Sequence, residues 1–528
     1  MPGLPLKPRY DVIIIGSGHN GLISAAYLAK AGLSVLVLER NEVPGGATQS
    51  RSTFPGMNAR LSVYSYLISL FPEKIASDLG LNLKLRSRKT SSWTPDFQEG
   101  RYRDLLIRND HDSANREAFE NFTGGSNDYQ GYCDLLSMQE EIASVIWPGL
   151  LHPLDSKANL ERKVSAKVWE AMIEKPIGEL IESRISDDLI RGLVFTDGRI
   201  GVSTSPHDES LLQNKCFLYH IIGQGTGEWR VPVGGMGSLV TQLIDMAQKT
   251  GNLTLLTRAE AKVIKPHLKT PTVHFDYDER EQEVEARFIL SNAAGQVLDH
   301  LISGSSGSTN CDVEGAGFKI NMLLRKLPRL RSSTCTADVS FAGTVHIDEG
   351  YEAMMDSHRE SVSGEIPSRP PGEIYCHTLT DHSILSEDLN RKGYHTLTLF
   401  GLDMPYRLFE TDNEGTRQEV VNRYLAGINR YLDEPIEECL AIDSEGNPCL
   451  EAMSAVDLEQ KVHLPKGNIF HGNLTWPYAE SNDEVGQWGV ETPYPNIYIC
   501  GSSAKRGGAV SGIPGHNAAM KVLEQIAT

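Results

Sequence analysis

Three glycines near the start of the sequence have the spacing of a turn that binds a nucleotide. Gly16, Gly18 and Gly21 form the pattern G-x-G-x-x-G between an apolar run at 10–15 and a helix-like stretch at 22–32. The first glycine permits a tight turn, the second lets the backbone approach a pyrophosphate, and the third allows the helix to pack closely on a sheet. The free N–H groups at the start of that helix would face the phosphates. The pattern therefore predicts a strand, a turn and a helix that bind a dinucleotide.

A carboxylate at the end of the next apolar run indicates which dinucleotides fit. Glu39 follows the run LSVLVL at 33–38. At the end of a parallel strand it would accept hydrogen bonds from an adenosine ribose, and it would repel a 2′-phosphate. Both apolar runs are typical of strands that are buried on both faces. We therefore predict a βαβ unit that binds FAD or NAD rather than NADP.

A second glycine pair follows this carboxylate. Gly45 and Gly46 complete the motif E-R-x-x-x-x-G-G with Glu39 and Arg40. This motif resembles the flavoproteins of the amine oxidase and phytoene desaturase superfamily. In that superfamily the paired glycines let the chain pass close to the FAD pyrophosphate and ribityl chain, and a nicotinamide dehydrogenase has no reason to carry them. The resemblance therefore implies that the cofactor is FAD.

The middle of the chain carries further segments of this resemblance. VPVGGMGSLVTQLIDMAQKTG at 231–251 is similar to the P-x-G-G-M-x-x-L segment of the superfamily, and FILSNAA at 288–294 is similar to its re-entry into the dinucleotide domain. Ala261 and Val263, with Ile264 directly after them, resemble the start of an A-x-V-x-x-I element, whose valine backbone contacts the adenine in the superfamily. By the same resemblance, the backbone of Val263 should contact the adenine here.

The C-terminal part resembles one branch of the superfamily, the phytoene desaturase-related oxidoreductases that include the pyridine-nucleotide-disulfide oxidoreductase domain-containing proteins. GNIFHG at 467–472 and GSSAKRGGAVSGIPGHNAAM at 501–520 carry this likeness. It implies that a glycine turn and the last helix bind the flavin half of FAD. Together, fingerprint and resemblance give these cofactor-binding candidates: Gly16, Ser17, Gly18, Asn20, Gly21, Glu39, Arg40, Gly45, Gly46, Ala47, Val263, Gly501, Gly508, Val510, Gly512 and Ile513.

The sequence differs from this branch of the superfamily at 504–506, where we look for catalytic residues. Ala504, Lys505 and Arg506 replace the Thr-His-Pro that the branch usually carries before its paired glycines. Lys505 and Arg506 could stabilise anionic reduced flavin, bind a substrate carboxylate or point to solvent, and we take them as candidate catalytic residues. His471 is a candidate general base, although a lone histidine is more often structural. Tyr64, Tyr66 and Trp229 could line the flavin cavity, or they could simply pack in the core.

The remaining periodicity predicts an α/β fold with a discontinuous dinucleotide domain. Strand-like runs at 319–327 and 395–402 and a helical stretch at 416–434 lie between the recognisable segments. We expect a Rossmann-like FAD-binding domain formed by 1–85, 225–300 and 460–528. An inserted mixed α+β domain, which binds the substrate, should be formed by 86–224 and 301–459.

Composition excludes several other classes of function. The formal net charge of −19 disfavours nucleic acid as a partner. The eight cysteines contain no C-x-x-C pair, so we expect no metal site and a reducing, cytoplasmic location. No run of about 18 apolar residues occurs, so we expect no membrane span. A proline-broken apolar stretch at 143–154 could form a core edge or touch a membrane surface.

The favoured function is that of an FAD-dependent desaturase, dehydrogenase or oxidase. It would take a hydride from a largely apolar substrate, such as an isoprenoid or a ring compound, and pass electrons to an acceptor such as dioxygen or a quinone. Two alternatives stay open at this point. One is a flavin amine oxidase, and the other is a non-catalytic FAD-containing binding or assembly protein.

Overall fold

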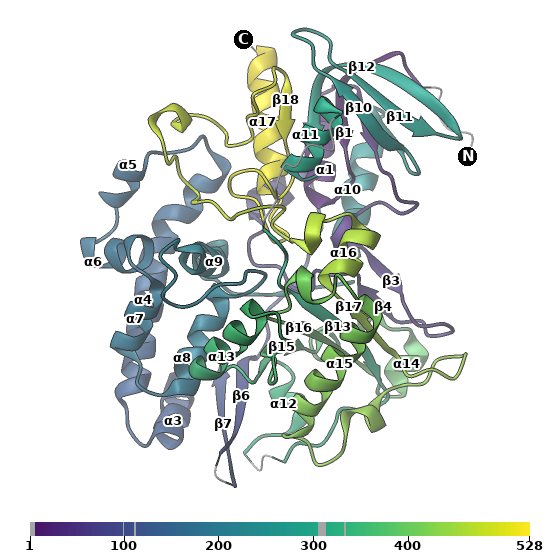
Figure 1. Cartoon of the computed structure of the whole chain (residues 1–528). Helices are drawn as coiled ribbons and strands as arrows, with labels where there is room; N and C mark the ends of the chain where they lie inside the picture. The colour runs from purple at the N-terminus through teal and green to yellow at the C-terminus, as the bar shows by residue number, and fades with distance from the viewer. Residues whose placement is uncertain (1–5, 99, 110–111, 305–312, 332–333, 528) are drawn as a thin grey trace.

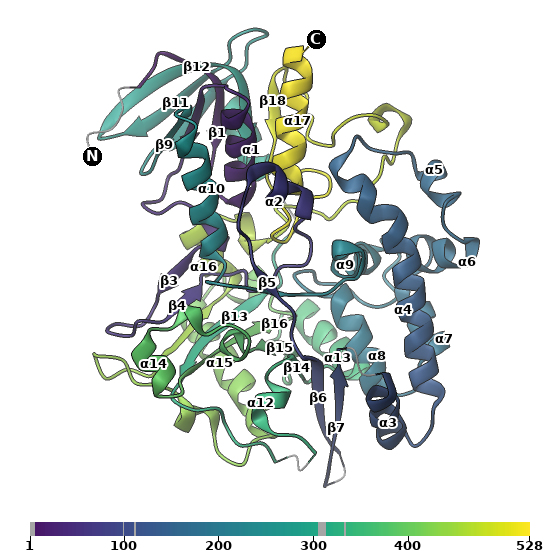
Figure 2. The same ribbon diagram turned by 180° about the vertical axis from the view of Figure 1, so that it is seen from behind.

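The computed structural model of the chain describes residues 6–98, 100–109, 112–304, 313–331 and 334–527. Figures 1 and 2 show three parts: a sheet with flanking helices that lies near both termini, a second sheet with its own helices, and a layer of helices beside them. This arrangement is the predicted α/β class. Two small two-stranded sheets link the parts, and they pair β3 (Ser50–Ser52) with β4 (Arg60–Ser62) and β5 (Leu85–Arg86) with β8 (Val231–Pro232).

The first sheet takes its seven strands from widely separated parts of the chain. β1 pairs in parallel with β2 and β12, β2 pairs in parallel with β9, and β12 pairs in parallel with β18. β10, β11 and β12 form an antiparallel extension. The strands, in the order of the sheet, are β10 (Glu260–Lys265), β11 (Thr272–Tyr277), β12 (Arg280–Ser291), β1 (Arg9–Ile15), β2 (Val35–Leu38) and β9 (Leu253–Leu256), with β18 (Ile497–Ile499) beside β12.

The apolar character of β1 follows from its position in the centre of this sheet. Val12 and Ile14 pack into a core that contains residues of four helices, whereas Ile13 and Ile15 pack into a second core on the opposite face. A parallel sheet covered on both faces requires such continuous apolar strands. The helices on the first face are α1 (His19–Lys30), α10 (Gly237–Lys249) and α17 (Ile513–Ala527), α2 (Glu73–Leu79) packs beside them, and α11 (Gly295–Ser303) lies on the other face.

The second sheet has seven strands and is mainly antiparallel. β14 and β6 pair in parallel, and the other pairs are antiparallel. In order, the strands are β17 (Leu450–Met453), β13 (Phe318–Leu324), β16 (His395–Gly401), β15 (Gly372–Tyr375), β14 (Thr344–Ile347), β6 (Thr90–Gln98) and β7 (Arg101–Arg108). The helices of this part are α12 (Ala337–Ser340), α13 (Tyr351–Val362), α14 (Glu387–Arg391), α15 (Asn413–Asn429) and α16 (Ala455–Val462).

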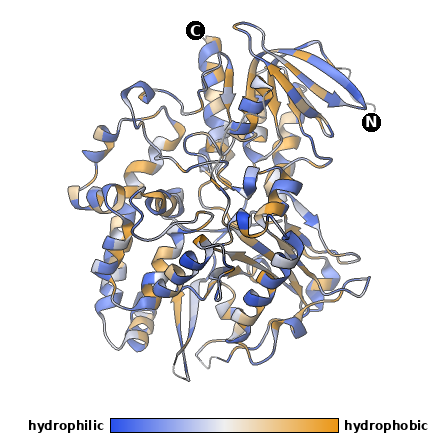
Figure 3. Ribbon diagram, viewed as in Figure 1, coloured by the Kyte–Doolittle hydropathy of each residue, from blue (hydrophilic) through white to orange (hydrophobic). Residues whose placement is uncertain are grey.

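A layer of helices lies beside both sheets and has a core of its own. Trp169, Phe195 and Phe217 are fully or almost fully buried in this core. Figure 3 shows hydrophilic and hydrophobic residues mixed along these helices, as expected where one side of each helix covers a core. The helices are α3 (Asp112–Thr123), α4 (Asn127–Ile146), α5 (Lys157–Glu161), α6 (Ala166–Trp169), α7 (Ile177–Arg184), α8 (Asp188–Phe195) and α9 (Leu212–Ile221).

The elements predicted between the recognisable segments are confirmed with shifted ends. The helix predicted at 416–434 is α15, which begins earlier because the Asp412 side chain accepts a hydrogen bond from Gly415 N. The strand predicted at 319–327 is β13, and the strand predicted at 395–402 is β16. Within the described ranges, no helix is both long enough and apolar enough to cross a bilayer.

Candidate functional site

The glycine turn after β1 is held against the end of β12. Gly16 has a positive φ of 89°, and a Cβ on Gly21 would lie 2.4 Å from Gly16 O. A Cβ on Gly18 would lie 2.6 Å from Asn292 Nδ2, and Asn292 Oδ1 accepts a hydrogen bond from Gly21 N at 3.2 Å. Gly16 and Gly21 are therefore required by the backbone geometry, whereas the atom nearest to a Cβ on Gly18 is the end of a side chain. Asn292, which positions the turn from the residue after β12, lies within the segment FILSNAA, but its contact with the turn was not predicted.

Glu39 is fixed at the end of β2 by its neighbours. Glu39 Oε2 accepts hydrogen bonds from Ser17 N at 3.0 Å and Ser17 Oγ at 2.6 Å, and Oε1 accepts one from Asn41 N at 2.8 Å. The residue is buried, and it lines a large cavity. A carboxylate oriented in this way can also accept hydrogen bonds from a bound ribose. Ser17 does not itself line the cavity, and its role here is to position Glu39.

The second glycine pair packs directly on the first turn. Gly45 and Gly46 have φ values of 116° and 54°, and a Cβ on Gly46 would lie 3.5 Å from the Cα of Gly18. Ala47, the next residue, accepts hydrogen bonds through its carbonyl oxygen from Tyr64 N and Ser65 N at 3.2 Å. The pair and Ala47 therefore line one continuous backbone surface of the cavity together with Gly16 and Gly18.

The predicted adenine contact of Val263 does not agree with its position. The cavity is lined on this side by 259–262, and Val263 is not among its described lining residues. The side chain of Val263 is 36% exposed, and the pairing of β10 with β11 shifts register between Ala261 and Val263. A register shift re-aims the residues that follow it. Arg40 lines the cavity next to this wall and forms an ion pair with Glu260 at 3.2 Å.

The C-terminal glycines shape the turn before α17 more than they line the cavity. Cβ atoms on Gly501, Gly508 and Gly512 would lie 2.6, 2.8 and 2.5 Å from Asn292 O, a Phe470 ring carbon and an Ile23 methyl carbon, respectively. These glycines and Ile513 lie behind the wall, whereas Val510 lines the cavity together with Ser502 and Ala509. The glycines at 501, 508 and 512 therefore allow close packing of this turn, and the turn places Val510 on the wall of the cavity.

Lys505 and Arg506 lie away from the cavity, so their positions do not agree with the predicted role at a flavin. Lys505 Nζ forms ion pairs with Glu480 at 2.8 Å and with Glu484 at 2.9 Å. Arg506 is buried, with a φ of 65°, and donates to the carbonyl oxygens of 150, 152 and 477. Backbone geometry turns both cations toward other loops. A structural role in joining these loops accounts for them.

Two of the histidines that line the cavity, His19 and His471, are neutral near pH 7. Burial lowers the pKa of His471 to about 4. Burial and the nearby His471 ring lower the pKa of His19, also to about 4. His19 Nδ1 lies 3.1 Å from Thr48 Oγ1. His471 has a φ of 60° and its Nδ1 atom has no hydrogen-bond partner among the described residues. Either imidazole can therefore exchange a hydrogen bond with a bound molecule, and neither supplies a positive charge.

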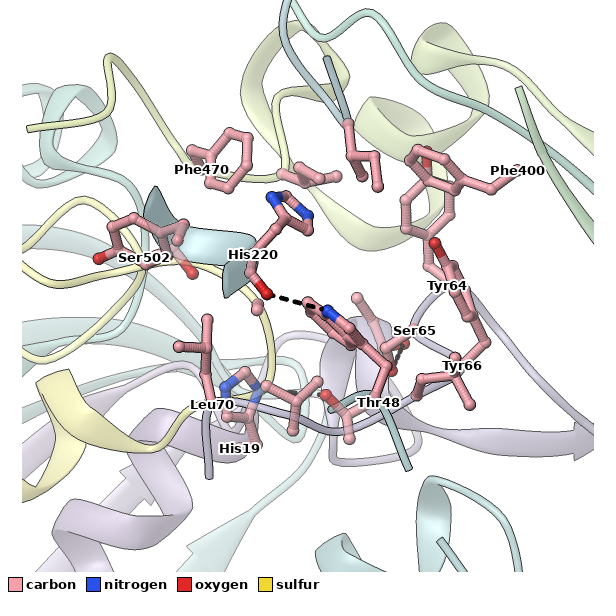
Figure 4. A pocket seen from close by; sticks show the side chains of 18 of the residues that line it. His19, Thr48, Tyr64, Ser65, Tyr66, Leu70, His220, Phe400, Phe470 and Ser502 are labelled. Carbon is pink, nitrogen blue, oxygen red and sulfur yellow. Dashed lines mark hydrogen bonds between the residues drawn. The ribbon is translucent and has the colours of Figure 1, made fainter. Parts of the chain in front are cut away.

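Beyond the glycine turns, the cavity continues into a chamber with aromatic walls, and its total volume is about 960 Å³. Figure 4 shows Tyr64, Tyr66 and Phe400 on one side and Phe470 and Ser502 on the other, with His220 between them. The Tyr66 and Tyr375 rings lie 4.4 Å apart, and Trp229 stacks on His220 at 5.4 Å. The three aromatic residues singled out in the sequence, Tyr64, Tyr66 and Trp229, all line this cavity.

A buried polar cluster lies on the far wall, which is built from the second sheet. His346 Nδ1 lies 2.5 Å from Glu349 Oε2 and 3.9 Å from Glu373 Oε1, and the Tyr375 hydroxyl donates to Glu373 Oε2. Ligand atoms of the two glutamates and the histidine lie within 4.8 Å of one another, which is close enough to hold a metal ion. Hydrogen bonds already account for this proximity. No local pattern predicts the cluster, because its members come from β14, β15 and the loop before α13.

The cluster should make stability depend on pH. Burial raises the pKa of Glu349 to about 8, and burial with the charge of Glu349 raises the pKa of Glu373 to about 7, whereas both ordinarily titrate near 4.5. Between pH 4.5 and pH 8 the folded chain therefore binds more protons than the unfolded chain. The free energy of unfolding falls as the pH rises through this range. The parent should therefore lose roughly 2 kcal/mol of unfolding free energy between pH 6 and 8 that Glu349→Gln retains, as measured by urea denaturation at each pH.

The matched control for this prediction is Glu352→Gln, which neutralises an exposed carboxylate on the neighbouring α13. Its stability should follow the same pH curve as the parent. If Glu349→Gln and the parent lost equal stability over this range, Glu349 would already be ionised in the folded protein.

Comparison with known proteins adds a family context to this geometry. Residues 14–73 match the family described as NAD(P)-binding Rossmann-like domain. The chain is 40% identical to an uncharacterised protein of Mycobacterium tuberculosis over 98% of both chains. It is 28% identical to the Mus musculus pyridine nucleotide-disulfide oxidoreductase domain-containing protein 2, over 99% of this chain and 94% of the other. Among solved structures, cyclohexylamine oxidase from Brevibacterium oxydans has the same fold, with a TM-score of 0.58, 14% identity and coverage of 99% and 100%.

Proposed function

Because the chain belongs to the phytoene desaturase-related oxidoreductases of the amine oxidase and carotenoid desaturase superfamily, we propose that it is an FAD-dependent enzyme that oxidises a largely apolar small molecule. One observation carries the proposal. A single cavity extends from the glycine turns and Glu39 to the aromatic chamber. A cofactor held at one end and a substrate held at the other would share that space.

The residues present fit FAD. The backbone surface at Gly18 and Gly46 is one that a Cβ would fill, and Glu39 is oriented to accept hydrogen bonds. Asn20 Oδ1 and His19 Nε2 are buried without a partner among the described residues, and both residues line the cavity at the start of α1. The N-terminus of α1 would bind the pyrophosphate, Glu39 and 259–262 the adenosine, and 45–48 with Val510 the remainder. When bound, FAD supplies the acceptor for a hydride from the substrate.

The chain itself would orient the substrate and exclude water. The chamber is lined by apolar side chains that favour a largely apolar substrate, including Leu67, Leu70, Ile107, Leu193, Val194 and Ile221. His471 is neutral, so its Nδ1 atom can form a hydrogen bond. The neutral ring cannot act as a cationic acid. α17 begins shortly after Val510, so its N-terminal partial charge would stabilise negative charge at this wall.

The purified protein should test this proposal directly. It should be yellow, and the released chromophore should be FAD by chromatography. Under anaerobic conditions, isoprenoids, cyclic hydrocarbons, carboxylated aromatics and amines are then added in turn, and bleaching of the visible absorption is recorded. Bleaching by an apolar compound supports the proposal, whereas bleaching by amines alone would favour an amine oxidase. FAD that no compound reduces would favour a binding protein. Reoxidation by dioxygen or by a quinone then identifies the electron acceptor.

A further inference from the structure

Two arginines lie on the wall of the chamber where the second sheet meets the helical layer. Arg88 precedes β6, and Arg108 ends β7, where it pairs with Thr90 across the two strands. Asn109 joins the two segments, because its N atom donates to Lys89 O at 3.1 Å and its Nδ2 atom donates to Arg88 O at 2.7 Å. The two chain segments are thus joined, and the side chains of Arg88 and Arg108 both line the cavity.

The Arg88 guanidinium has a defined orientation. Arg88 Nη1 donates to Thr344 Oγ1 at 2.9 Å, and the guanidinium carbon lies 5.8 Å from the centre of the Tyr375 ring. One neutral hydrogen bond leaves most of its five N–H donors for another partner. The serines at 91 and 92 line the wall beside it and offer further neutral donors.

Neither arginine has a counter-ion among the residues that the structure describes. No described carboxylate oxygen lies within 4.0 Å of either guanidinium, although Asp112, Glu228 and Glu373 also line the cavity. By contrast, Arg103 on the same hairpin forms ion pairs with Asp96 and Asp187. A cation that is withdrawn from water without a partner costs free energy, and a bound anion would offset that cost.

The acidic side chains nearest to Arg88 do not neutralise it fully. Burial lowers the pKa of Arg88, whereas the nearby groups Tyr375, Glu373 and Glu228 raise it by a smaller amount. The Glu373 carboxylate is already engaged by the Tyr375 hydroxyl, and its pKa is raised to about 7. Burial also raises the pKa of Asp197, on the opposite wall, to about 8. The Glu373 carboxyl is therefore occupied by Tyr375, and no described carboxylate oxygen forms an ion pair with the Arg88 guanidinium.

The apolar part of the chamber begins next to the two arginines. Ile107 immediately precedes Arg108, and Leu193 and Val194 of α8 line the same cavity, as does Leu70 on the side of the glycine turns. A ligand with a charged end at the arginines and an apolar chain along these residues would reach toward the nucleotide end. Leu136 of α4, which is 39% exposed, marks where this wall reaches solvent.

We propose that the substrate is an apolar molecule with a terminal anionic group, and that Arg88 and Arg108 bind this group while the apolar chain extends toward the cofactor. This substrate class rests on the proposed function, since it concerns the same cavity. A carboxylate or a phosphate would satisfy the two guanidinium groups, and both accept paired hydrogen bonds from arginine.

Calorimetric titration of the holoprotein with four ten-carbon probes tests the proposal: decanoate, decyl phosphate, decanol and decylamine. The probes share an apolar chain and differ at the terminal group, so the comparison isolates the anion. Decanoate or decyl phosphate should bind at least about tenfold more tightly than decanol, and decylamine most weakly. The tighter of the two anions identifies the natural headgroup.

Variants assign the effect to the two arginines. Arg88→Met and Arg108→Met should each reduce the preference for the anion over decanol to about threefold or less, with the affinity for decanol unchanged. Arg88→Lys should keep part of the preference. Arg86→Met is the matched control, because Arg86 is exposed, donates to Thr380 O and does not line the cavity.

Two results would overturn the proposal: equal binding of decanoate, decyl phosphate and decanol by the parent protein, or an anion preference that survives in both methionine variants. If one variant fails to fold, the other still decides the question. Calorimetry needs neither turnover nor flavin reduction. A protein that prefers the anions but whose flavin no compound bleaches would therefore contradict the proposed oxidation and leave the anion site supported.

Discussion

The Gly18→Glu variant should be purified as a folded protein that has lost its flavin. A Cβ at this position would lie 2.6 Å from Asn292 Nδ2, the end of a side chain that can rotate away, so the fold can accommodate the change. The new carboxylate would occupy the surface at the N-terminus of α1 that we assign to the pyrophosphate. Like charges placed together in this way cost several kcal/mol, so FAD should bind at least about 100-fold more weakly.

The flavin content of this variant can be measured from the ratio of visible to ultraviolet absorption, with circular dichroism to verify the fold. Gly125→Glu is the matched control, since Gly125 is exposed and a Cβ there meets no atom within 4 Å. It adds the same charge and should stay yellow. A Gly18→Glu protein with full flavin content would show that the cofactor does not lie on the glycine turn.

Arg199→Met should produce the largest loss of stability. Arg199 and Asp403 form an ion pair in which both side chains are completely buried, and the Asp403 carboxylate also lies 3.8 Å from His358 Nδ1. The pair joins the helical layer, where residue 199 follows α8, to the end of β16. Removal of the arginine leaves a buried carboxylate without its cationic partner, with His358 and Ser357 beside it. Breaking such a pair typically costs about 3–5 kcal/mol.

The urea midpoint and the melting temperature of Arg199→Met should both fall. Arg359→Met provides the comparison, because Arg359 forms an ion pair with Asp356 in which both side chains are more than half exposed. That change should cost about 0–1 kcal/mol. Equal stability of the two variants would mean that the buried pair is replaceable by a methionine side chain and does not hold the two parts together.

The sequence was most informative where function and structure depend on neighbouring residues. The spacing of Gly16, Gly18 and Gly21 predicts a turn whose geometry involves only a strand, a helix and one partner, and the structure has that turn. The position of Glu39 was predictable for the same reason, because it directly follows the next strand, β2. The α/β class and the family were also predicted correctly, since they rest on such local patterns.

Local sequence patterns could not predict the directions in which the side chains of the candidate site residues point. Lys505 and Arg506 follow a glycine motif, yet Arg506 adopts a φ of 65°, and the two side chains find partners at 480, 484 and in the loop at 150–152. Val263 is moved by a register shift in β10. In each case the decisive contacts are with residues that are distant in sequence.

The far wall of the chamber was not predicted, because it forms only by pairing across the chain. β14 lies beside β6 in parallel, and this pairing brings Thr344 to Arg88 and places the His346 cluster opposite the glycine turns. No spacing within either strand signals that contact. Long-range pairing of this kind is set by the packing of the whole second sheet.

The union of distant segments around β12 has a consequence for the order in which the protein matures. One edge of β12 pairs with β1, and the other is shared by β11 and β18. α1 touches α17 so closely that Ser24 Oγ donates to Gly515 O at 2.7 Å. On a ribosome, the nascent glycine turn would therefore wait for nearly five hundred further residues before its supporting sheet closes. FAD, bound as proposed, would therefore meet its complete site only after β18 and α17 have been synthesised, and until then one edge of β12 stays partly unpaired.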